Sequence, residues 1–333
     1  MTTPIKTALI GAGFIGRVHA KNLSQNPDFD LAYVVDANEE VGKDIAARNG
    51  AEWLASPEQV FADPSIEAVW IATPPASHAS LLRAASKSKK AIFCEKPLSP
   101  DMEEAAQLVA ELEGYDKPVF LGFNRRFDPS HARLKQLIDE GAVGKIEMVV
   151  ITSRDPGPPP VDYMRATPGG IFYDSMIHDF DIARWLIGAE PTELYATATA
   201  NLGPDVNPDK EYDAATTLMK LPGGAICQLI CSRRATFGYD QRIEVFGSKG
   251  MATSTNHNET QVVLANGEGF RSDPLKDFFT TRYAEAFVAE LDVFARACRG
   301  EKVTYADAAD GAAALRLSLE ALKSAQEEKP RGL

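Results

Sequence analysis

The stretch "ALIGAGFIGRVHA", residues 8–20, decides the fold of the N-terminal part of the chain. It places Gly11, Gly13 and Gly16 directly after an apolar run and at the start of a helical pattern. In such a strand–turn–helix unit the first glycine permits a tight bend, the second lets a ligand approach the backbone, and the third lets the helix pack closely on the strand. The helix N-terminus also presents free N–H groups and a positive dipole end. The stretch therefore predicts a turn that binds phosphate groups.

A G-x-G-x-x-G pattern alone is a weak signal, but an acidic residue stands where this interpretation needs one. Asp36 ends the apolar run "AYVVD", twenty positions after Gly16, and is followed by Ala37 rather than by an arginine. A carboxylate there accepts a hydrogen bond from a ribose 2′-hydroxyl and repels a 2′-phosphate. We therefore predict NAD rather than NADP as cofactor; the alternative is a capping aspartate in a fold that binds no nucleotide. The expected NAD contacts in this region are Gly11, Gly13, Phe14, Ile15, Gly16 and Asp36.

Alternating strands and helices continue to about residue 123. Apolar runs predict strands over Lys6–Ile10, Leu31–Val35, Ala68–Ala72, Ala91–Cys94 and Val119–Phe123, with helices near 14–25, 38–49, 77–88 and 101–113. Near-continuous apolar strands alternating with helices indicate a parallel, doubly wound sheet. We therefore assign residues 1–123 to an NAD-binding Rossmann domain.

The pattern changes in residues 124–333, which we assign to a substrate-binding and oligomerisation domain whose final helices are able to pack back on the first. We expect a helix over Pro129–Glu140, a strand in "IEMVVITSRD" (146–155), a proline-rich loop, and strands joined by turns from Thr192 to Leu264. Two helices near 277–299 and 306–327 follow. This succession indicates an open, mainly antiparallel sheet, so the fold class is α/β followed by α+β.

Two further loops follow predicted strands of the first domain, at the end of the sheet where open α/β folds bind ligands. "ATPPASH" (72–78) contributes Thr73, Pro74 and His78 as expected cofactor contacts, although His78 could equally cap a helix. "CEKPLSP" (94–100) contributes Glu95 and Lys96. A residue before proline is held in an extended backbone, which could aim the Lys96 ammonium into a cleft. An ordinary surface lysine is the alternative.

A third motif, "DSMIHDFDIARW" (174–185), has a histidine among three aspartates. On one continuous helix, Asp174, His178, Asp181 and Trp185 share a face, and Met176, Phe180, Ala183 and Ile187 fall on the opposite, apolar face. The polar face either only contacts water or acts on a substrate. The other histidines carry less signal: His19 is expected to pack, and His131 and His257 to contact solvent.

Bulk composition restricts the class of protein. The 333 residues are 44% hydrophobic and 25% charged, with a formal net charge of -12. That charge disfavours nucleic acid and anionic membranes as partners. No stretch approaches the roughly 20 apolar residues of a membrane span. The sequence starts without a signal peptide and its four cysteines are scattered, so we expect a reducing cytoplasm and no metal site.

Taken together, the chain resembles the glucose–fructose oxidoreductase/inositol dehydrogenase/rhizopine-catabolism family over essentially its whole length. The motifs that carry the resemblance are "GAGFIG", "ATPPASH", "EKPL", "GFNRRFDP" and "GGIFYDSMIHDFDIARWL". Within the family, "ITSRDPGPPPVDY", "SRRATFGYDQRIEVFGSKG" and "DFFTTRYAEAF" look most like bacterial myo-inositol 2-dehydrogenases.

The resemblance implies a Rossmann domain, an open sheet that mediates oligomerisation, usually into a homotetramer, and a shared active site. It implies Lys96, Asp174 and His178 as catalytic residues. Substrate contacts implied in the same way are Asp155, Asp181, Tyr239 and Arg126. One departure stands out: where inositol dehydrogenases often read "RYTEAY", this chain has Phe287, so a hydroxyl that could touch the polyol is missing.

These residues suit the oxidation of a secondary alcohol. A histidine can take the hydroxyl proton near neutral pH, an aspartate can stabilise the resulting imidazolium, and a lysine can stabilise the developing alkoxide. We therefore expect NAD-dependent oxidation of a cyclic polyol. The leading expectation is oxidation of myo-inositol to 2-keto-myo-inositol (scyllo-inosose). The alternatives are a scyllo- or chiro-inositol or glucose-type dehydrogenase, a non-catalytic NAD-binding regulator, and an NAD-assisted glycosidase, to which nothing in the sequence points.

Overall fold

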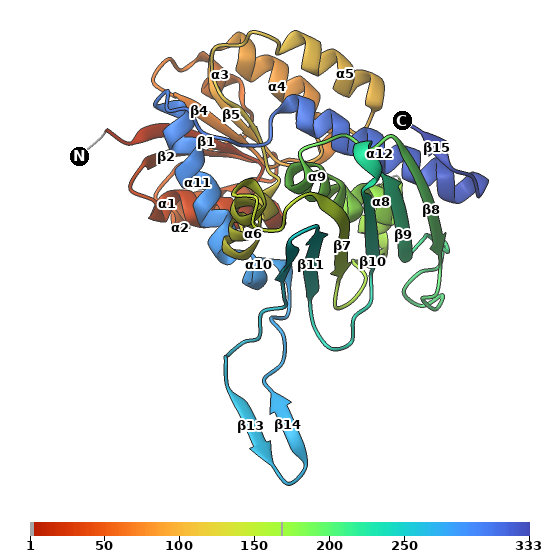
Figure 1. The fold of residues 1–333 in the computed structure, drawn as a ribbon. Coiled ribbons are helices and arrows are strands. Elements are labelled where there is room, and N and C mark those ends of the chain that lie inside the picture. The colour runs from red at the N-terminus through yellow and green to blue at the C-terminus, as the bar shows by residue number, and fades with distance from the viewer. Residues whose placement is uncertain (1–2, 168) are drawn as a thin grey trace. The chain divides into compact units, whose positions relative to one another are not determined.

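The computed structural model describes residues 3–167 and 169–333 of the chain (Figure 1). They form two compact units, each built from two segments of the chain. Unit 1 comprises Met1–Phe127 and Ala286–Ala313, and unit 2 comprises Asp128–Glu285 and Ala314–Leu333. Within the described residues, no helix has both the length and the apolar character needed to cross a membrane.

Unit 1 is built on a six-stranded, wholly parallel sheet in the order β3-β2-β1-β4-β5-β6. The strands are β1 (Ile5–Ile10), β2 (Phe29–Val35), β3 (Glu52–Leu54), β4 (Ala68–Ile71), β5 (Ala91–Cys94) and β6 (Val119–Leu121). The strand order reverses between β1 and β4, which is the switch point where open α/β sheets bind ligands. The predicted parallel, doubly wound fold is confirmed.

Helices connect these strands. They are α1 (Phe14–Gln25), α2 (Glu39–Arg48), α3 (Glu58–Ala62), α4 (His78–Lys87) and α5 (Met102–Glu111), with the short 3-10 turns η1 (Pro75–Ser77) and η2 (Asn124–Phe127). The expected helices near 14–25, 38–49, 77–88 and 101–113 are α1, α2, α4 and α5. Strand β3 and helix α3 were not expected, because three and five residues are too few to show a period.

The core of unit 1 is aromatic and is shared with a helix from the distant end of the chain. Trp70 of β4 stacks on Phe93 of β5, with ring centroids 3.7 Å apart. Phe294 of α11 (Ala284–Cys298) meets the same two rings edge-on, at 5.2 and 6.0 Å. From the sequence we assign all residues after 123 to the second domain and expect that its final helices are able to pack back on the first. In the structure, Ala286–Ala313 is part of unit 1.

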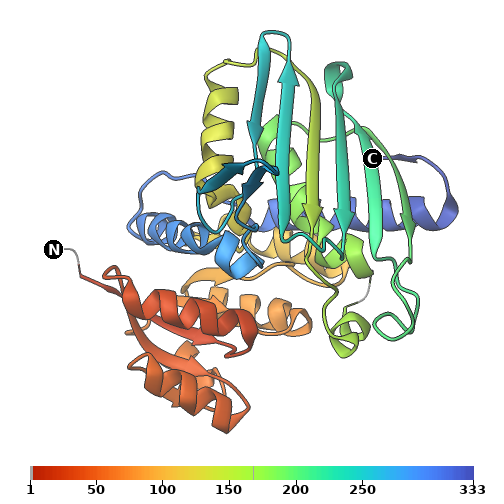
Figure 2. The same cartoon turned by 90° about the horizontal axis from the view of Figure 1, so that it is seen from below.

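Unit 2 is built on a seven-stranded sheet in the order β12-β11-β7-β10-β9-β8-β15 (Figure 2). The strands are β7 (Ile146–Arg154), β8 (Glu193–Thr199), β9 (Ala214–Lys220), β10 (Ile226–Ser232), β11 (Asp240–Gly247), β12 (Gly250–Ser254) and β15 (Arg331–Gly332). Only β7 and β10 pair in parallel, so the expected mainly antiparallel sheet is confirmed. The C-terminal β15 was not expected to be a strand.

The remaining elements are mostly helices, and α9 contacts the sheet over β7 and β10. They are α6 (Pro129–Asp139), α7 (Val161–Ala166), α8 (Gly170–Asp174), α9 (Met176–Ile187), α10 (Phe279–Arg282), α12 (Ala308–Glu327), which contributes to both units, and the turn η3 (Pro222–Gly224). A separate hairpin, β13 (Val263–Asn266) and β14 (Gly269–Ser272), projects from unit 2 (Figure 1).

The two faces of the unit 2 sheet differ. Inward-facing residues such as Val149 and Ile151 are buried with α8 and α9 in one apolar core. On the alternate positions an apolar row crosses four adjacent strands, because Met251, Phe246, Met148 and Ile226 are neighbours in the register. All four side chains are exposed. We call this set the apolar row.

Candidate active site

The glycine turn after β1 has the geometry that a nucleotide phosphate requires. Gly11 has a φ of +100°, and a Cβ there would lie 2.6 Å from the carbonyl oxygen of Ala72. A Cβ on Gly16 would lie 2.1 Å from the carbonyl oxygen of Gly11, so helix and turn can pack only with glycine at both positions. A Cβ on Gly13 would meet nothing within 4 Å. The open space lies at the start of α1, where free N–H groups can hold an anion.

Asp36 is fixed beside this turn at the end of β2. Its Oδ2 accepts a hydrogen bond from the backbone N–H of Ala12 at 2.7 Å, and its Oδ1 accepts one from Asn38 at 2.8 Å. Trp53 Nε1 donates to the Asp36 carbonyl oxygen at 3.0 Å. A carboxylate has about four acceptor positions, so two remain for ribose hydroxyls. The carboxylate is thus held in position by the backbone.

His78 connects the two loops that follow β4 and β5. Its Nδ1 lies 2.7 Å from the carbonyl oxygen of Pro97, and its Nε2 lies 2.9 Å from that of Thr73. Burial lowers the pKa of His78, against the opposing effect of these two carbonyls. A neutral imidazole carries a single N–H and donates to one of the two at a time. The buried His78 side chain therefore links the two loops. Of the other expected cofactor contacts in the first loop, Pro74 is exposed and Thr73 is half-buried.

The loop after β5 presents Glu95 and Lys96 side by side. Glu95 is buried, and its backbone N–H donates to Ile71 of β4 at 2.9 Å. Lys96 is half-buried, and its peptide bond to Pro97 is cis.

Three other expected site residues lie in unit 1. Phe14 is 63% exposed and Ile15 is half-buried. Arg126 is buried and donates to Asp310 at 3.2 Å.

In unit 2 the motif with Asp174 and His178 is two helices rather than one. Helix α8 ends at Asp174 and α9 begins at Met176, with Ser175 between them. The expectation of one continuous helix is therefore wrong, because Ser175 interrupts it. Both Asp174 and His178 are half-buried, whereas Asp181 is only 1% exposed, so the polar row is not uniformly in contact with solvent. Met176, Phe180 and Ala183 are buried in the apolar core.

Asp174 is held by two residues that the sequence did not single out. The hydroxyl of Tyr163 donates to Asp174 Oδ1 at 2.9 Å, and Nη2 of the buried Arg233 lies 3.4 Å from Oδ2. Burial and then the negative charge of Asp174 raise the pKa of Tyr163, so this hydroxyl remains a donor at neutral pH. Tyr163 and Arg233 lie in "PPPVDY" and "SRRATF", both used for the family resemblance.

The remaining expected substrate contacts of unit 2 lie where β7 ends and β11 begins, at the same end of two paired strands. Asp155 directly follows β7, is half-buried, and donates its backbone N–H to Ser232 at 2.9 Å. Tyr239 directly precedes β11, is buried, and meets the rings of Phe278 and Tyr283 edge-on at 6.4 and 6.0 Å.

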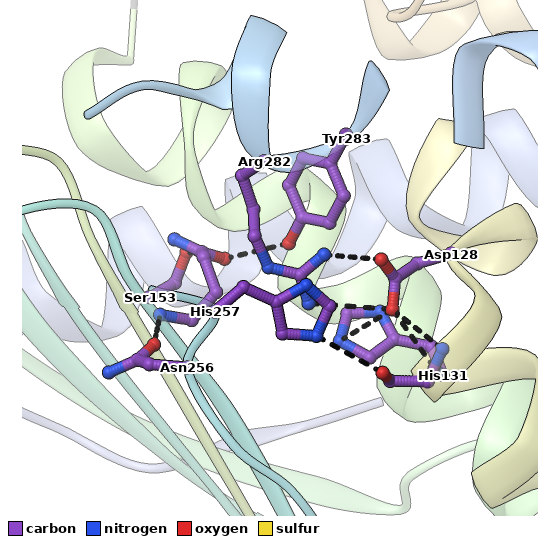
Figure 3. A network of polar contacts seen from close by, with 9 residues as sticks. Asp128, His131, Ser153, Asn256, His257, Arg282 and Tyr283 are labelled. Carbon is purple, nitrogen blue, oxygen red and sulfur yellow. Dashed lines mark hydrogen bonds and ion pairs between the residues drawn. The ribbon is translucent and has the colours of Figure 1, made fainter. Parts of the chain in front are cut away.

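A polar network continues from Tyr283 across unit 2 (Figure 3). The Tyr283 hydroxyl donates to Gln241 Oε1 at 3.1 Å, and Ser153 donates to the same oxygen at 3.1 Å. The neighbouring Arg282 is buried and pairs with the buried Asp128, which caps α6. The network fixes α10 against the sheet and α6.

Two histidines take part in this network, and the expectation that both contact solvent is wrong for the first. His131 is 2% exposed and its Nε2 lies 3.9 Å from Asp128 Oδ1. His257 is half-buried, with Nε2 3.2 Å from the hydroxyl of Ser130 (Figure 3). Burial would raise the pKa of Asp128, but the charges of His131 and Arg282 hold it below its usual value.

Comparison with known proteins identifies the family. Residues 5–123 match the oxidoreductase family with an NAD-binding Rossmann fold, and residues 131–253 match the GFO/IDH/MocA C-terminal domain. The chain belongs to the GFO/IDH/MocA oxidoreductase family. It is 41% identical to the inositol 2-dehydrogenase of Rhizobium meliloti over 98% of both chains.

The chain is also similar to solved structures of inositol dehydrogenases. A myo-inositol dehydrogenase from Corynebacterium glutamicum is similar with a TM-score of 0.94 and 38% identity, covering 99% of each chain. A scyllo-inositol dehydrogenase from Lactobacillus casei, with bound cofactor NAD(H) and scyllo-inositol, is similar with a TM-score of 0.92 and 26% identity, covering 99% of each chain.

The cofactor of this GFO/IDH/MocA protein is NAD. The residues present fit it: Gly13 leaves open space at the α1 N-terminus, and the Asp36 carboxylate is held where the adenosine ribose binds in Rossmann folds. Within residues 3–167 and 169–333, no cluster of three or more histidine, cysteine, aspartate or glutamate side chains could hold a metal ion.

Proposed function

We propose that the protein is an NAD-dependent inositol 2-dehydrogenase that oxidises myo-inositol to 2-keto-myo-inositol (scyllo-inosose). The observation that carries the proposal is the similarity of the whole chain, across both units, to proteins named inositol dehydrogenases. Within unit 2, the pairing of Asp174 with Tyr163 and Arg233 supports it, because it fixes a carboxylate two residues before the start of α9, the helix that carries His178.

In the proposed reaction NAD supplies the acceptor for the hydride that leaves the substrate carbon. His178 takes the proton of the reacting hydroxyl as general base, and the Asp174 carboxylate stabilises the imidazolium. Lys96 stabilises the negative charge that develops on the substrate oxygen. Tyr163 and Arg233 keep the Asp174 carboxylate oriented, since both act as donors to it.

The remaining hydroxyls of the polyol need partners, and we assign these to Asp155, Asp181, Tyr239 and Arg126. Carboxylates accept hydrogen bonds from hydroxyl groups and repel an acidic substrate, which favours an uncharged polyol. Phe287 does not take part in this proposal. It is buried in unit 1, where its ring meets that of His19 edge-on at 5.8 Å, so the structure gives no support to a lost polyol contact at this position.

We also propose that the enzyme is a cytoplasmic homotetramer. The apolar row supports an assembly through the unit 2 sheet, because exposed apolar side chains on neighbouring strands mark interaction surfaces. The free thiols of Cys94, Cys227 and Cys298 support a cytoplasmic location, because thiols stay reduced there. The mass in solution, measured by light scattering, tests the tetramer; a monomer would refute it.

The test of the reaction is NADH formation with NAD and a panel of myo-, scyllo- and chiro-inositol, glucose, xylose and a 2-hydroxy acid. We expect the highest kcat/KM with myo-inositol. A preference for another polyol, such as the scyllo-inositol bound in the Lactobacillus casei structure, would change the proposed substrate but not the proposed mechanism. Binding of NAD without turnover of any member would instead indicate a regulator.

Two variants test the assigned roles. We expect His178→Ala and Lys96→Ala each to lower kcat by about 10²-fold or more, since each removes a group that acts on the transition state. The affinity for NAD, measured by titration calorimetry, should stay within about threefold, which corresponds to less than 1 kcal/mol. A variant with normal kcat would remove that residue from the mechanism.

A further inference from the structure

A polar cluster lies buried in unit 1, formed by three residues from separate parts of the chain. His19 of α1 places Nε2 2.7 Å from Oε1 of Glu95, at the end of β5. Its other ring nitrogen, Nδ1, lies 4.0 Å from Oε1 of Glu290 on α11. His19 and Glu290 are fully buried, and Glu95 is 8% exposed. An imidazole thus stands between two carboxyl groups.

The surroundings of the cluster are aromatic. The ring of His19 lies 5.2 Å from Trp70, 5.4 Å from Phe93 and 5.8 Å from Phe287, all between ring centroids. Within the described residues, neither oxygen of Glu290 has a hydrogen-bond partner. Burial, and then the charge of Glu95, raise the pKa of Glu290 well above its usual value. Glu290 is therefore a neutral acid that can direct its proton toward His19.

The two nitrogens of His19 face different carboxyl groups. Nε2 lies within hydrogen-bond distance of Glu95, and Nδ1 faces Glu290. At 4.0 Å, the contact between Nδ1 and Glu290 Oε1 is longer than a hydrogen bond. The arrangement leaves no net charge on Glu290, where a buried, unpaired carboxylate would be costly.

Glu95 transmits this arrangement to the loop that carries Lys96. One oxygen of its carboxylate faces His19, and the other accepts the backbone N–H of Lys96 at 3.2 Å. Gly122 leaves room for the carboxylate, because a Cβ there would lie 3.0 Å from Oε2. The Glu95 side chain is therefore fixed at both oxygens, and the Lys96 backbone depends on its position.

We propose that His19 and Glu290 are positioning residues, which act through Glu95 to hold Lys96 in the place where it acts on the substrate. The inference rests on the catalytic role proposed for Lys96. A different role is a purely structural one, in which the cluster stabilises the packing of α1 and α11 on the sheet and any loss of activity follows a loss of folded protein.

Matched variants separate the two roles. His19→Gln retains an N–H that can reach Glu95, whereas His19→Leu removes it; Glu290→Gln retains a neutral donor, whereas Glu290→Leu removes it. Phe294→Leu is the control, because Phe294 packs on the same rings of Trp70 and Phe93 without a polar group.

For a positioning role we expect the two leucine variants at His19 and Glu290 to lose about 10- to 100-fold in kcat, since small misplacements cost that much. The two glutamine variants should stay within about threefold of the wild type, as should Phe294→Leu despite its lower Tm. KM for the polyol and Kd for NAD, measured on folded protein, should change by less than about threefold in all five variants.

A double-mutant cycle with Lys96→Ala decides whether the effect passes through Lys96. If it does, adding His19→Leu to Lys96→Ala lowers kcat by less than about threefold further, because the group being positioned is already absent. Multiplicative losses, or a normal kcat in His19→Leu, would overturn the positioning role and leave the proposed function standing. A normal kcat in Lys96→Ala, or a wild type that turns over no polyol, would overturn both.

Discussion

Replacing Glu290 by glutamine should stabilise unit 1 relative to the wild type, and the difference should grow as the pH rises. Glutamine resembles the neutral form of the acid, and Glu290 is fully buried with its pKa raised by burial and by the charge of Glu95. Between the ordinary pKa of about 4.3 and the raised value in the folded state, the folded wild type binds more protons than the unfolded chain. Its stability therefore falls with increasing pH over this window.

The size of the effect follows from the proton linkage. Each pH unit inside the window costs the wild type up to about 1.4 kcal/mol in free energy of unfolding, so the loss accumulates as the pH rises above the ordinary pKa. Glutamine does not titrate and escapes this loss. The titratable groups that face Glu290 are His19 from α1 and Glu95 from the loop after β5, and both remain in the variant.

Urea unfolding followed by tryptophan fluorescence measures this difference. The chain has three tryptophans, and in a Trp185→Phe background the emission comes from Trp53 and Trp70 of unit 1. We expect the free energies of unfolding of Glu290→Gln and its parent to diverge from pH 4 to pH 7, with the variant gaining. The exposed Glu113→Gln is the control and should run parallel to the parent. Parallel curves for Glu290→Gln would refute a neutral, buried acid.

Three further predictions address the cofactor, unit 2 and the assembly. Asp36→Ser combined with Ala37→Arg should shift the ratio of kcat/KM from NAD toward NADP by about tenfold or more, because a 2′-phosphate gains a cation and loses a repelling carboxylate; an unchanged ratio would contradict the role of Asp36. Asp128→Asn should lower the free energy of unfolding by about 3–5 kcal/mol at pH 7, since the buried Arg282 loses its counter-charge. The ionised Asp128 stabilises the fold above its ordinary pKa, and this stability is lost as the pH falls through the lowered pKa of the folded state. If urea unfolding shows the same loss of free energy for Asp128→Asn at pH 2.5 and at pH 7, this role of Asp128 is contradicted. Phe246→Lys should lower the oligomer mass in light scattering with secondary structure retained, and an unchanged mass would exclude the apolar row from the interface.

The sequence predicted those features that depend on local rules. Backbone sterics and apolar periodicity, which act over a few residues, predict the glycine turn, most strands of unit 1 and helix α1. The break at Ser175 could not be predicted in the same way, because neither glycine nor proline marks it. Nor could the pairing of Asp174 with Arg233, since those two residues meet only in the folded unit.

The buried cluster of unit 1 shows a signal that was present but not used. Phe287, Glu290, Leu291 and Phe294 recur with the spacing of one helical face, so a glutamate stands within an apolar stripe. His19 likewise shares its face of α1 with the buried Leu23. A charged residue on an apolar face predicts a buried partner, but which partner it finds depends on contacts between distant segments.

The division of unit 1 between two chain segments affects its synthesis. The first 127 residues leave the ribosome with Trp70 and Phe93 in place, but Phe294 and Leu291, which complete their core, follow much later. At translation rates of about 5–20 residues per second, the nascent sheet waits roughly 10–30 s for this helix. During that interval its apolar surface is open to chaperones or to other chains. Separate expression of the nucleotide-binding half would require a linker from Phe127 to Ala286, and a fragment cut after Phe127 should aggregate.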